Sequence, residues 1–103
     1  MKIGVDIAYI PRFKDVDEHF IKKILTDDEM LQYQKLPSEK RILFLAGRWA
    51  SKEAIYKANN KNDYLHYSIL NEENGKPYVK DHPEIKISIS HDNDYVVAFV
   101  IEE

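Results

Sequence analysis

The chain opens on an alternation of apolar and other side chains over residues 2–9. Ile3, Val5 and Ile7 share one face of this segment, and Asp6 lies on the other. Such alternation is typical of a strand, because successive side chains point to opposite faces. We therefore expect a strand whose apolar face, formed by the two isoleucines and the valine, is buried.

Three helices are expected after this strand. Residues 12–24 carry apolar side chains at helical spacing. The segment Thr26–Glu29 has the spacing of a capping box, which predicts a second helix that ends at about Leu36. Ser38 is the expected N-cap of the main helix, which extends from about Glu39 to Ala58.

The rest of the chain predicts a sheet. The expected strands are residues 65–70, 77–80, 85–90 and 95–101, with turns at Asn74-Gly75 and at residues 91–94. Strands that follow one another through short turns pair in antiparallel fashion. The fold class is therefore predicted to be α+β, with an antiparallel sheet packed on one long helix.

Composition narrows the classes of protein. The length of 103 residues fits a single domain that spans residues 1–103. The absence of cysteine excludes disulfides, thiolate metal sites and a cysteine nucleophile. A net charge of −3 argues against a broad nucleic-acid surface. Apolar runs are too short for a signal peptide or a membrane span, so we expect a cytoplasmic protein without membrane partners.

Two charged residues interrupt the apolar stripe of the main helix. The stripe comprises Ile42, Leu43, Leu45, Ala46, Trp49, Ala50 and Ala54. Glu53 and Lys57 fall within it, where a charge is costly to desolvate unless it is paired or binds a metal. One interpretation is an ordinary ion pair between these two side chains. The other is a functional site.

The functional interpretation is favoured by carboxylates that could bind a metal and by basic side chains that could bind phosphate. Asp6 on the first strand and Glu53 on the helix are suited to Mg²⁺, which prefers hard oxygen ligands. Arg48, Lys52 and Lys57 are candidates for holding phosphates, because no glycine-rich phosphate loop is present. A solvated carboxylate and a solvated basic helix face are the alternatives.

His91 is a further candidate. It stands where a strand is expected to turn, a place that often displays functional groups. A surface histidine is the alternative, and His19, His66 and His82 show no metal-ligand spacing.

The main helix also carries apolar residues away from its stripe. Phe44 and Ile55 lie on the opposite side of the helix. In so small a domain, this second apolar side predicts packing against another subunit.

Four segments in order resemble the holo-acyl-carrier-protein synthase family, the small stand-alone 4′-phosphopantetheinyl transferases of bacteria. They are Gly4–Ile7, Phe44–Ala54, Gly75–Val79 and Ser88–His91. The middle segment, with its Lys-Glu-Ala, is the most specific. Two departures are the short chain and the polar run Asn59–Asp63, which contains no glycine where many members have a glycine-containing loop.

The resemblance implies a reaction and a set of roles. A serine of acyl carrier protein would attack the β-phosphate of coenzyme A and release 3′,5′-ADP, in fatty acid biosynthesis. Asp6 and Glu53 match Mg²⁺ ligands, Lys57 matches a pyrophosphate contact, and His91 matches a coenzyme A contact. Two candidates remain for the general base. One is a metal-bound water relayed by Glu53, and the other is Asp92, which is beside His91 in the sequence.

The resemblance also implies an assembly and a docking surface. Members form trimers with active sites between subunits. Arg12 and Lys23 fall at positions where the family docks acidic carrier protein, and Lys22 adds charge there, whereas His19 replaces a basic residue. The alternatives are a non-catalytic module of the same fold that binds carrier protein or coenzyme A, and a structural α+β domain.

Overall fold

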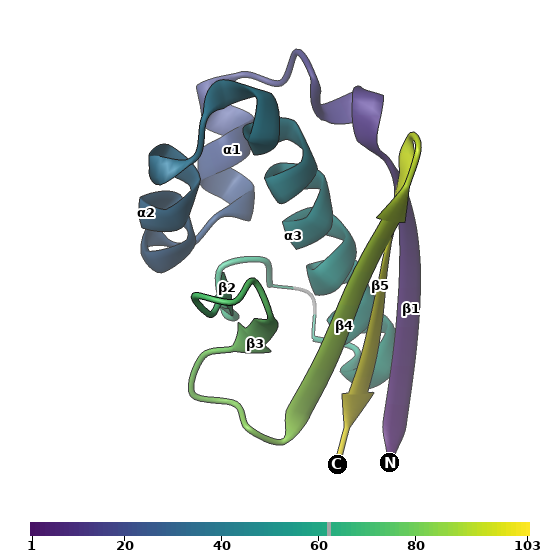
Figure 1. Ribbon diagram of the computed structural model, residues 1–103. Helices are drawn as coiled ribbons and strands as arrows, with labels where there is room; N and C mark the ends of the chain where they lie inside the picture. The colour runs from purple at the N-terminus through teal and green to yellow at the C-terminus, as the bar shows by residue number, and fades with distance from the viewer. Residues whose placement is uncertain (62) are drawn as a thin grey trace.

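A long central helix lies between a three-stranded sheet and a layer of shorter elements (Figure 1). The computed structural model describes residues 1–61 and 63–103. The elements in order are β1 (Lys2–Tyr9), the 3-10 helix η1 (Ile10–Phe13), α1 (Glu18–Ile24), α2 (Asp27–Lys35), α3 (Ser38–Asn59), β2 (Ile69–Asn71), β3 (Pro77–Val79), β4 (Ile85–Asp92) and β5 (Tyr95–Glu102).

The larger sheet has the strand order β1-β5-β4, and both pairings are antiparallel. Strand β5 therefore separates the other two, and the two chain ends meet at one end of the sheet (Figure 1). Strands β2 and β3 form a separate hairpin, whose turn contains Gly75 at a φ of 90°. The predicted α+β fold is thereby confirmed, as is the Asn74-Gly75 turn.

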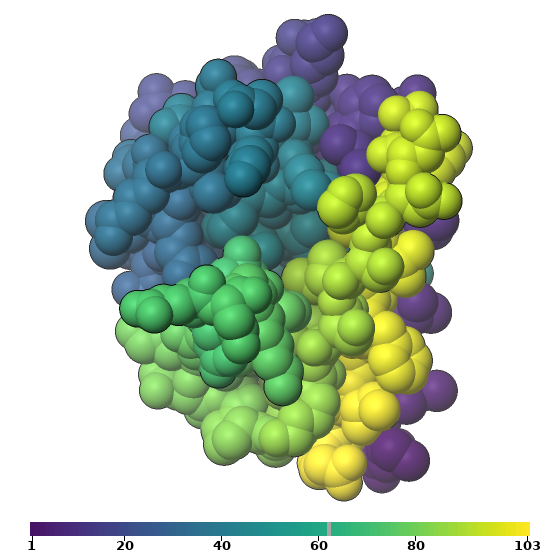
Figure 2. Space-filling model, viewed as in Figure 1, coloured from purple at the N-terminus to yellow at the C-terminus, as the bar shows by residue number. Residues whose placement is uncertain are grey.

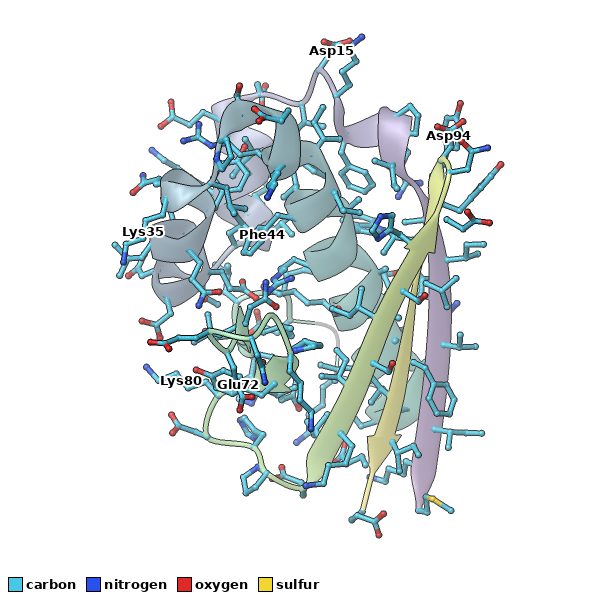
Figure 3. All side chains as sticks on the ribbon, viewed as in Figure 1. Asp15, Lys35, Phe44, Glu72, Lys80 and Asp94 are labelled. Atoms are coloured by element: carbon cyan, nitrogen blue, oxygen red, sulfur yellow. The ribbon has the colours of Figure 1, made fainter. Side chains whose placement is uncertain are left out.

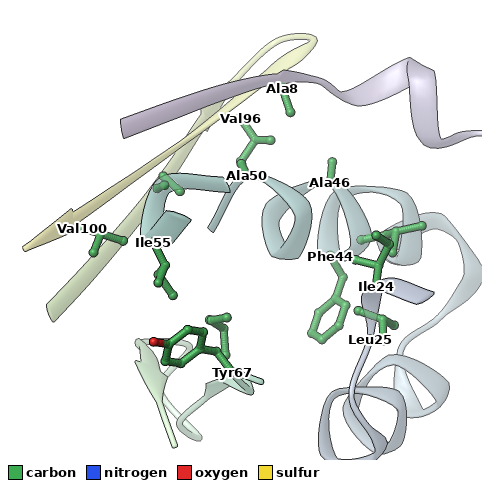
Figure 4. Packing of buried hydrophobic residues seen from close by; sticks show 14 of the residues in the cluster. Ala8, Ile24, Leu25, Phe44, Ala46, Ala50, Ile55, Tyr67, Val96 and Val100 are labelled. Atoms are coloured by element: carbon green, nitrogen blue, oxygen red, sulfur yellow. The ribbon is translucent and has the colours of Figure 1, made fainter. Parts of the chain in front are cut away.

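The helix α3 approaches the sheet closely because small side chains line the contact. Ala46 and Ala50 face Ala8 and Val96, and all four are buried (Figure 4). Gly4 marks the tightest point, where an added Cβ would overlap the carbonyl oxygen of Ala54 and lie 2.9 Å from the amide nitrogen of Ala58. Only glycine fits this crossing of strand and helix.

The prediction for the buried face of β1 was wrong. Ile3, Val5 and Ile7 are 61%, 52% and 62% exposed, whereas Gly4 and Ala8 face α3. The alternation identifies two faces correctly, but the close approach of the helix admits only the small residues. The chain by itself thus leaves the larger apolar face of β1 uncovered, as it does Phe99 of β5, which is 41% exposed.

The second apolar side of α3 is covered by the same chain, which corrects the expectation of a subunit contact there. Phe44 and Ile55 are 7% and 0% exposed. Figure 4 shows Ile55 facing the segment that carries Tyr67, and Phe44 near Leu25. The shorter elements therefore take the place that a second subunit was predicted to occupy.

Several element boundaries differ from the predictions. The expected helix over residues 12–24 divides into η1 and α1, because Asp17 caps α1 by accepting a hydrogen bond from the Phe20 amide at 2.8 Å. Thr26 and Glu29 form the predicted capping box. Pro37, rather than Ser38, stands at the N-cap of α3.

The strand boundaries differ as well. The expected strand over residues 65–70 is reduced to β2. Strand β4 continues through His91 and Asp92, which were expected in a turn. In the part of the chain that the structure describes, no helix is long and apolar enough to cross a membrane.

Candidate active site

The crossing of β1 over α3 brings Asp6 and Lys57 together. Lys57 Nζ lies 3.0 Å from Asp6 Oδ1 and also donates to the carbonyl oxygen of Val5 at 3.1 Å. The Asp6 side chain is 14% exposed and that of Lys57 is 52% exposed. A carboxylate and an ammonium group from distant parts of the sequence thus form one accessible pair at the surface.

Glu53 lies one helical turn before Lys57 but has a different partner. Its Oε2 accepts a hydrogen bond of 2.6 Å from the hydroxyl of Tyr64. No ion pair joins Glu53 to Lys57 among residues 1–61 and 63–103. The interpretation of these two residues as an ordinary helical ion pair is therefore wrong, because the lysine pairs with Asp6 instead.

The phenol of Tyr64 is affected by the charges of two carboxylates. Burial, the hydrogen bond to Glu53 and the negative charges of Glu53 and Asp6 together raise the pKa of its phenol. A phenol is protonated at neutral pH even without this shift, so the hydroxyl is the donor in its bond to Glu53. The charges of Asp6 and Glu53 thus both act on the Tyr64 phenol, although only Glu53 bonds it.

The donor set fits Mg²⁺. Asp6 uses Oδ1 for Lys57 and Glu53 uses Oε2 for Tyr64, so each carboxylate has a second oxygen outside these bonds. Mg²⁺ commonly binds one or two carboxylates and completes its shell with substrate phosphates and water. Within the described ranges, no three acidic or histidine side chains gather as a metal cluster, so phosphate and water would supply the remaining ligands.

Aromatic side chains extend from this site to the N-terminal helices. Trp49 stacks on Tyr64 at 5.3 Å between ring centroids and on Phe20 of α1 at 5.9 Å. The Arg12 guanidinium lies 5.3 Å from the centroid of the Trp49 ring. Arg12 is exposed, so a positive charge lies beside the site.

The two candidate docking lysines lie on α1. Lys22 and Lys23 are both exposed, as their predicted role requires. Lys22 forms an exposed pair with Glu18 at 3.4 Å, which solvent and salt screen strongly. The charges on this helix therefore remain available to an acidic partner.

Lys52 was predicted to hold phosphate, and that prediction was wrong. It is 4% exposed, and its Nζ contacts Glu29 Oε1 at 2.5 Å and the carbonyl oxygen of Ile24. Burial lowers the pKa of Lys52, while Glu29 opposes the shift. The amine is thus held inside the protein.

Arg48 lies beside the same buried cluster. Its Nε donates to the carbonyl oxygen of Ile69 at 2.9 Å, and its Nη2 donates to Asn71 Oδ1 at 3.0 Å. Burial lowers its pKa to about 10. The side chain also lines an open hollow that includes Lys40 and His91, so its predicted contact with coenzyme A stays a prediction.

His91 and Asp92 stand at the far edge of the sheet. His91 is opposite Val96 of β5, whereas Asp6 is opposite Ala98 on the other side of that strand. No hydrogen bond or ion pair joins His91 to Asp6 within the described part of the chain, nor does one join it to Asp92. A single chain therefore presents two separate groups of candidate residues.

Tyr64 is the site residue that sequence analysis missed. It follows a polar run and belongs to no periodic pattern or quoted motif. Its role depends on the return of the chain toward α3, which places the ring on Trp49 and the hydroxyl on Glu53. No local signal in the sequence indicates this contact.

Known proteins match the chain over nearly its full length. Residues 2–100 match the model of the 4′-phosphopantetheinyl transferase superfamily. A holo-[acyl-carrier-protein] synthase from Anoxybacillus flavithermus is 42% identical over 112 residues, covering 98% of this chain and 93% of the relative.

Solved structures of similar proteins share the fold. The holo-(acyl-carrier-protein) synthase of Bacillus anthracis, in complex with coenzyme A (3′,5′-ADP), has a TM-score of 0.84 at 32% identity and covers 96% of this chain and 92% of its own. The enzyme of the same name from Neisseria meningitidis has a TM-score of 0.87 at 28% identity and covers 99% and 97%. The resemblance noted from the four segments is confirmed, and the chain belongs to the 4′-phosphopantetheinyl transferase superfamily.

Proposed function

We propose that the chain transfers the 4′-phosphopantetheine arm of coenzyme A to a serine of acyl carrier protein, in fatty acid biosynthesis. The observation that carries this function is the group formed by Asp6, Lys57 and Glu53 where β1 crosses α3. Relatives with the matching name support the reaction, and a coenzyme A complex of one of them supports the substrate. A binding module without catalysis would not need this arrangement of carboxylates and lysine.

The reaction exchanges one phosphorus–oxygen bond for another. The serine Oγ forms a bond to the β-phosphorus of coenzyme A, the bond to the bridging oxygen breaks, and 3′,5′-ADP leaves with that electron pair. Lys57, half exposed beside Asp6, stabilises the charge of the leaving phosphate. Asp6 and Glu53 would hold Mg²⁺, which neutralises the charge of the pyrophosphate when it is bound. The serine proton passes to a base, for which a water molecule relayed by Glu53 and the carboxylate of Asp92 are the candidates.

The transfer is tested by mass spectrometry of apo acyl carrier protein incubated with this chain, coenzyme A and Mg²⁺. The expected result is a mass gain of one phosphopantetheine per carrier protein, with one 3′,5′-ADP released. If a relative modifies the same carrier protein and this chain does not, the proposed function is wrong.

A homotrimer with active sites between subunits is the assembly that best fits this function. The uncovered apolar face of β1, with Ile3, Val5 and Ile7, supports an interface, because isolated proteins rarely expose such contiguous patches. The separation of His91 from Asp6 in one chain supports a site completed by a neighbour. Each subunit would then contribute Asp6, Glu53 and Lys57 to the site at one interface and His91 to the site at its other interface.

We expect inactive subunits to complement each other. Glu53→Ala and His91→Ala chains, each inactive alone, should regain activity when co-expressed, because about a quarter of randomly mixed interfaces would carry both intact halves. Differently tagged chains allow mixed oligomers to be purified before the assay. Verified mixed oligomers without activity would show that each site lies within one chain, and a monomer in solution would contradict the assembly altogether.

We further expect carrier-protein binding to depend on Arg12 and the lysines of α1. Arg12→Glu should raise the KM for carrier protein by about tenfold, equivalent to about 1.4 kcal/mol, and leave the KM for coenzyme A nearly unchanged. Added salt should produce the same selective effect in the unmodified protein. Lys35→Glu, an equal charge reversal at the far end of α2 (Figure 3), is the control. Equal changes for both substrates would argue against this docking surface.

A further inference from the structure

Tyr64 is fixed at both ends of its side chain. The ring stacks on Trp49 with an interplanar angle of 20°, and Trp49 stacks in turn on Phe20. The hydroxyl donates to Glu53 Oε2 at 2.6 Å. The backbone that follows is held as well, because the Leu65 amide donates to Asp63 Oδ1 at 3.0 Å. The phenol therefore occupies one place relative to α3.

This fixed donor limits what the Glu53 carboxylate can do. A glutamate side chain has three rotatable bonds and otherwise samples many orientations. With Oε2 engaged by Tyr64, Oε1 is the oxygen that remains for another ligand. Groups that hydrogen-bond a metal ligand from behind orient that ligand, and their loss typically weakens metal binding.

We propose that Tyr64 is a positioning residue, which holds Glu53 through Oε2 so that Oε1 is presented to the divalent metal. This inference rests on the proposed function, because it requires Glu53 to bind the metal. Tyr64 directly follows the polar run Asn59–Asp63 in the sequence. The support for Glu53 therefore comes from the stretch of chain after α3, not from the helix itself.

The test uses Mn²⁺ as a spectroscopic probe. Binding of Mn²⁺ to the full-length protein in the presence of coenzyme A is measured by electron paramagnetic resonance, without carrier protein and therefore without turnover. Tyr64→Phe keeps the ring stack and removes only the hydroxyl. It should weaken Mn²⁺ binding by about 10- to 100-fold. The Mg²⁺ concentration needed for half-maximal transfer should rise in parallel.

A matched control separates this effect from a general loss of structure. Tyr67→Phe removes a hydroxyl from the same segment, but that hydroxyl bonds Asn59 Nδ2 at 3.2 Å rather than Glu53. Mn²⁺ affinity should be unchanged in this variant. An equal loss in both variants would overturn the proposal, as would an unchanged affinity in Tyr64→Phe.

Glu53→Gln distinguishes failure of this inference from failure of the proposed function. If Glu53→Gln binds Mn²⁺ like the unmodified protein, the metal assignment itself is wrong, and the inference falls with it. If Glu53→Gln is weakened and Tyr64→Phe is not, only the role of Tyr64 is wrong. In the double variant, Tyr64→Phe should add almost nothing to the effect of Glu53→Gln, because the hydroxyl acts through that carboxylate. Additive losses would contradict the proposal.

Discussion

Asp6→Ala and Glu53→Ala are each expected to reduce transfer by about a thousandfold, which corresponds to about 4 kcal/mol of lost transition-state stabilisation. The reason is that both carboxylates are proposed to hold the metal: Asp6 pairs with Lys57 where β1 crosses α3, and Glu53 lies one helical turn before that lysine. Removal of either leaves too few protein oxygens to hold a divalent metal against a pyrophosphate. The measurement is the initial rate of carrier-protein modification with saturating coenzyme A.

Folding should survive these changes. Asp6→Ala leaves Lys57 without its carboxylate, but the lysine side chain is 52% exposed and water can solvate it. Excess chelator should abolish transfer by the unmodified protein to the same extent. Glu73→Ala, at an exposed acidic position in the turn between β2 and β3, is the control and should remain active. Full activity in chelator, or near-normal turnover by either variant, would show that the metal assignment is wrong.

The arrangement of elements was largely predictable because periodicity reports which residues share a face. It does not report which face the rest of the chain covers. In β1 the larger side chains Ile3, Val5 and Ile7 suggested the buried face, yet α3 packs on Gly4 and Ala8. Figure 2 shows β1 at the edge of the molecule, beside β5 and β4. The exposed apolar face of β1 would be explained if another molecule covered it. A single sequence does not show whether one does.

The candidate site was predictable to the extent that charges stood out from an apolar pattern. Lys52 and Glu53 are neighbours in sequence, and both were candidates, Glu53 because it interrupts the apolar stripe and Lys52 as a possible phosphate ligand. The structure places Lys52 inside the protein against Glu29, and Glu53 at the site beside Tyr64. An unusual charge on a helix therefore predicts a partner, but the fold decides whether that partner is a ligand or another side chain.

The pair formed by Glu29 and Lys52 is expected to dominate stability. Glu29 is 0% exposed, and besides Lys52 Nζ it accepts hydrogen bonds from the amides of Thr26 at 2.9 Å and Ile69 at 2.7 Å. It thereby joins the start of α2 to α3 and to β2. Breaking a buried pair leaves the remaining charge without compensation, which costs about 3–5 kcal/mol. Glu29→Ala should lower the free energy of unfolding in urea by this amount.

A neighbouring pair provides the control. Asp28 and Lys80 also pair, at 2.7 Å, but their side chains are 41% and 46% exposed. Asp28→Ala should therefore change stability far less than Glu29→Ala, although the residues are adjacent on α2. All variants must be compared at one protein concentration, because the proposed trimer would contribute to apparent stability.

The combined variant Glu29→Leu with Lys52→Met isolates the cause. It removes both charges of the pair, so no unpaired ammonium remains inside, although the buried Arg48 loses the nearby charge of Glu29 and the amides of Thr26 and Ile69 lose their acceptor. Stability should recover only in part from the loss seen in Glu29→Ala, because unsatisfied buried amides are themselves costly. If Glu29→Ala is no less stable than Asp28→Ala, the buried charges are not compensated as the structure indicates. If the double variant is as unstable as Glu29→Ala, the lost amide bonds rather than the unpaired ammonium account for the effect.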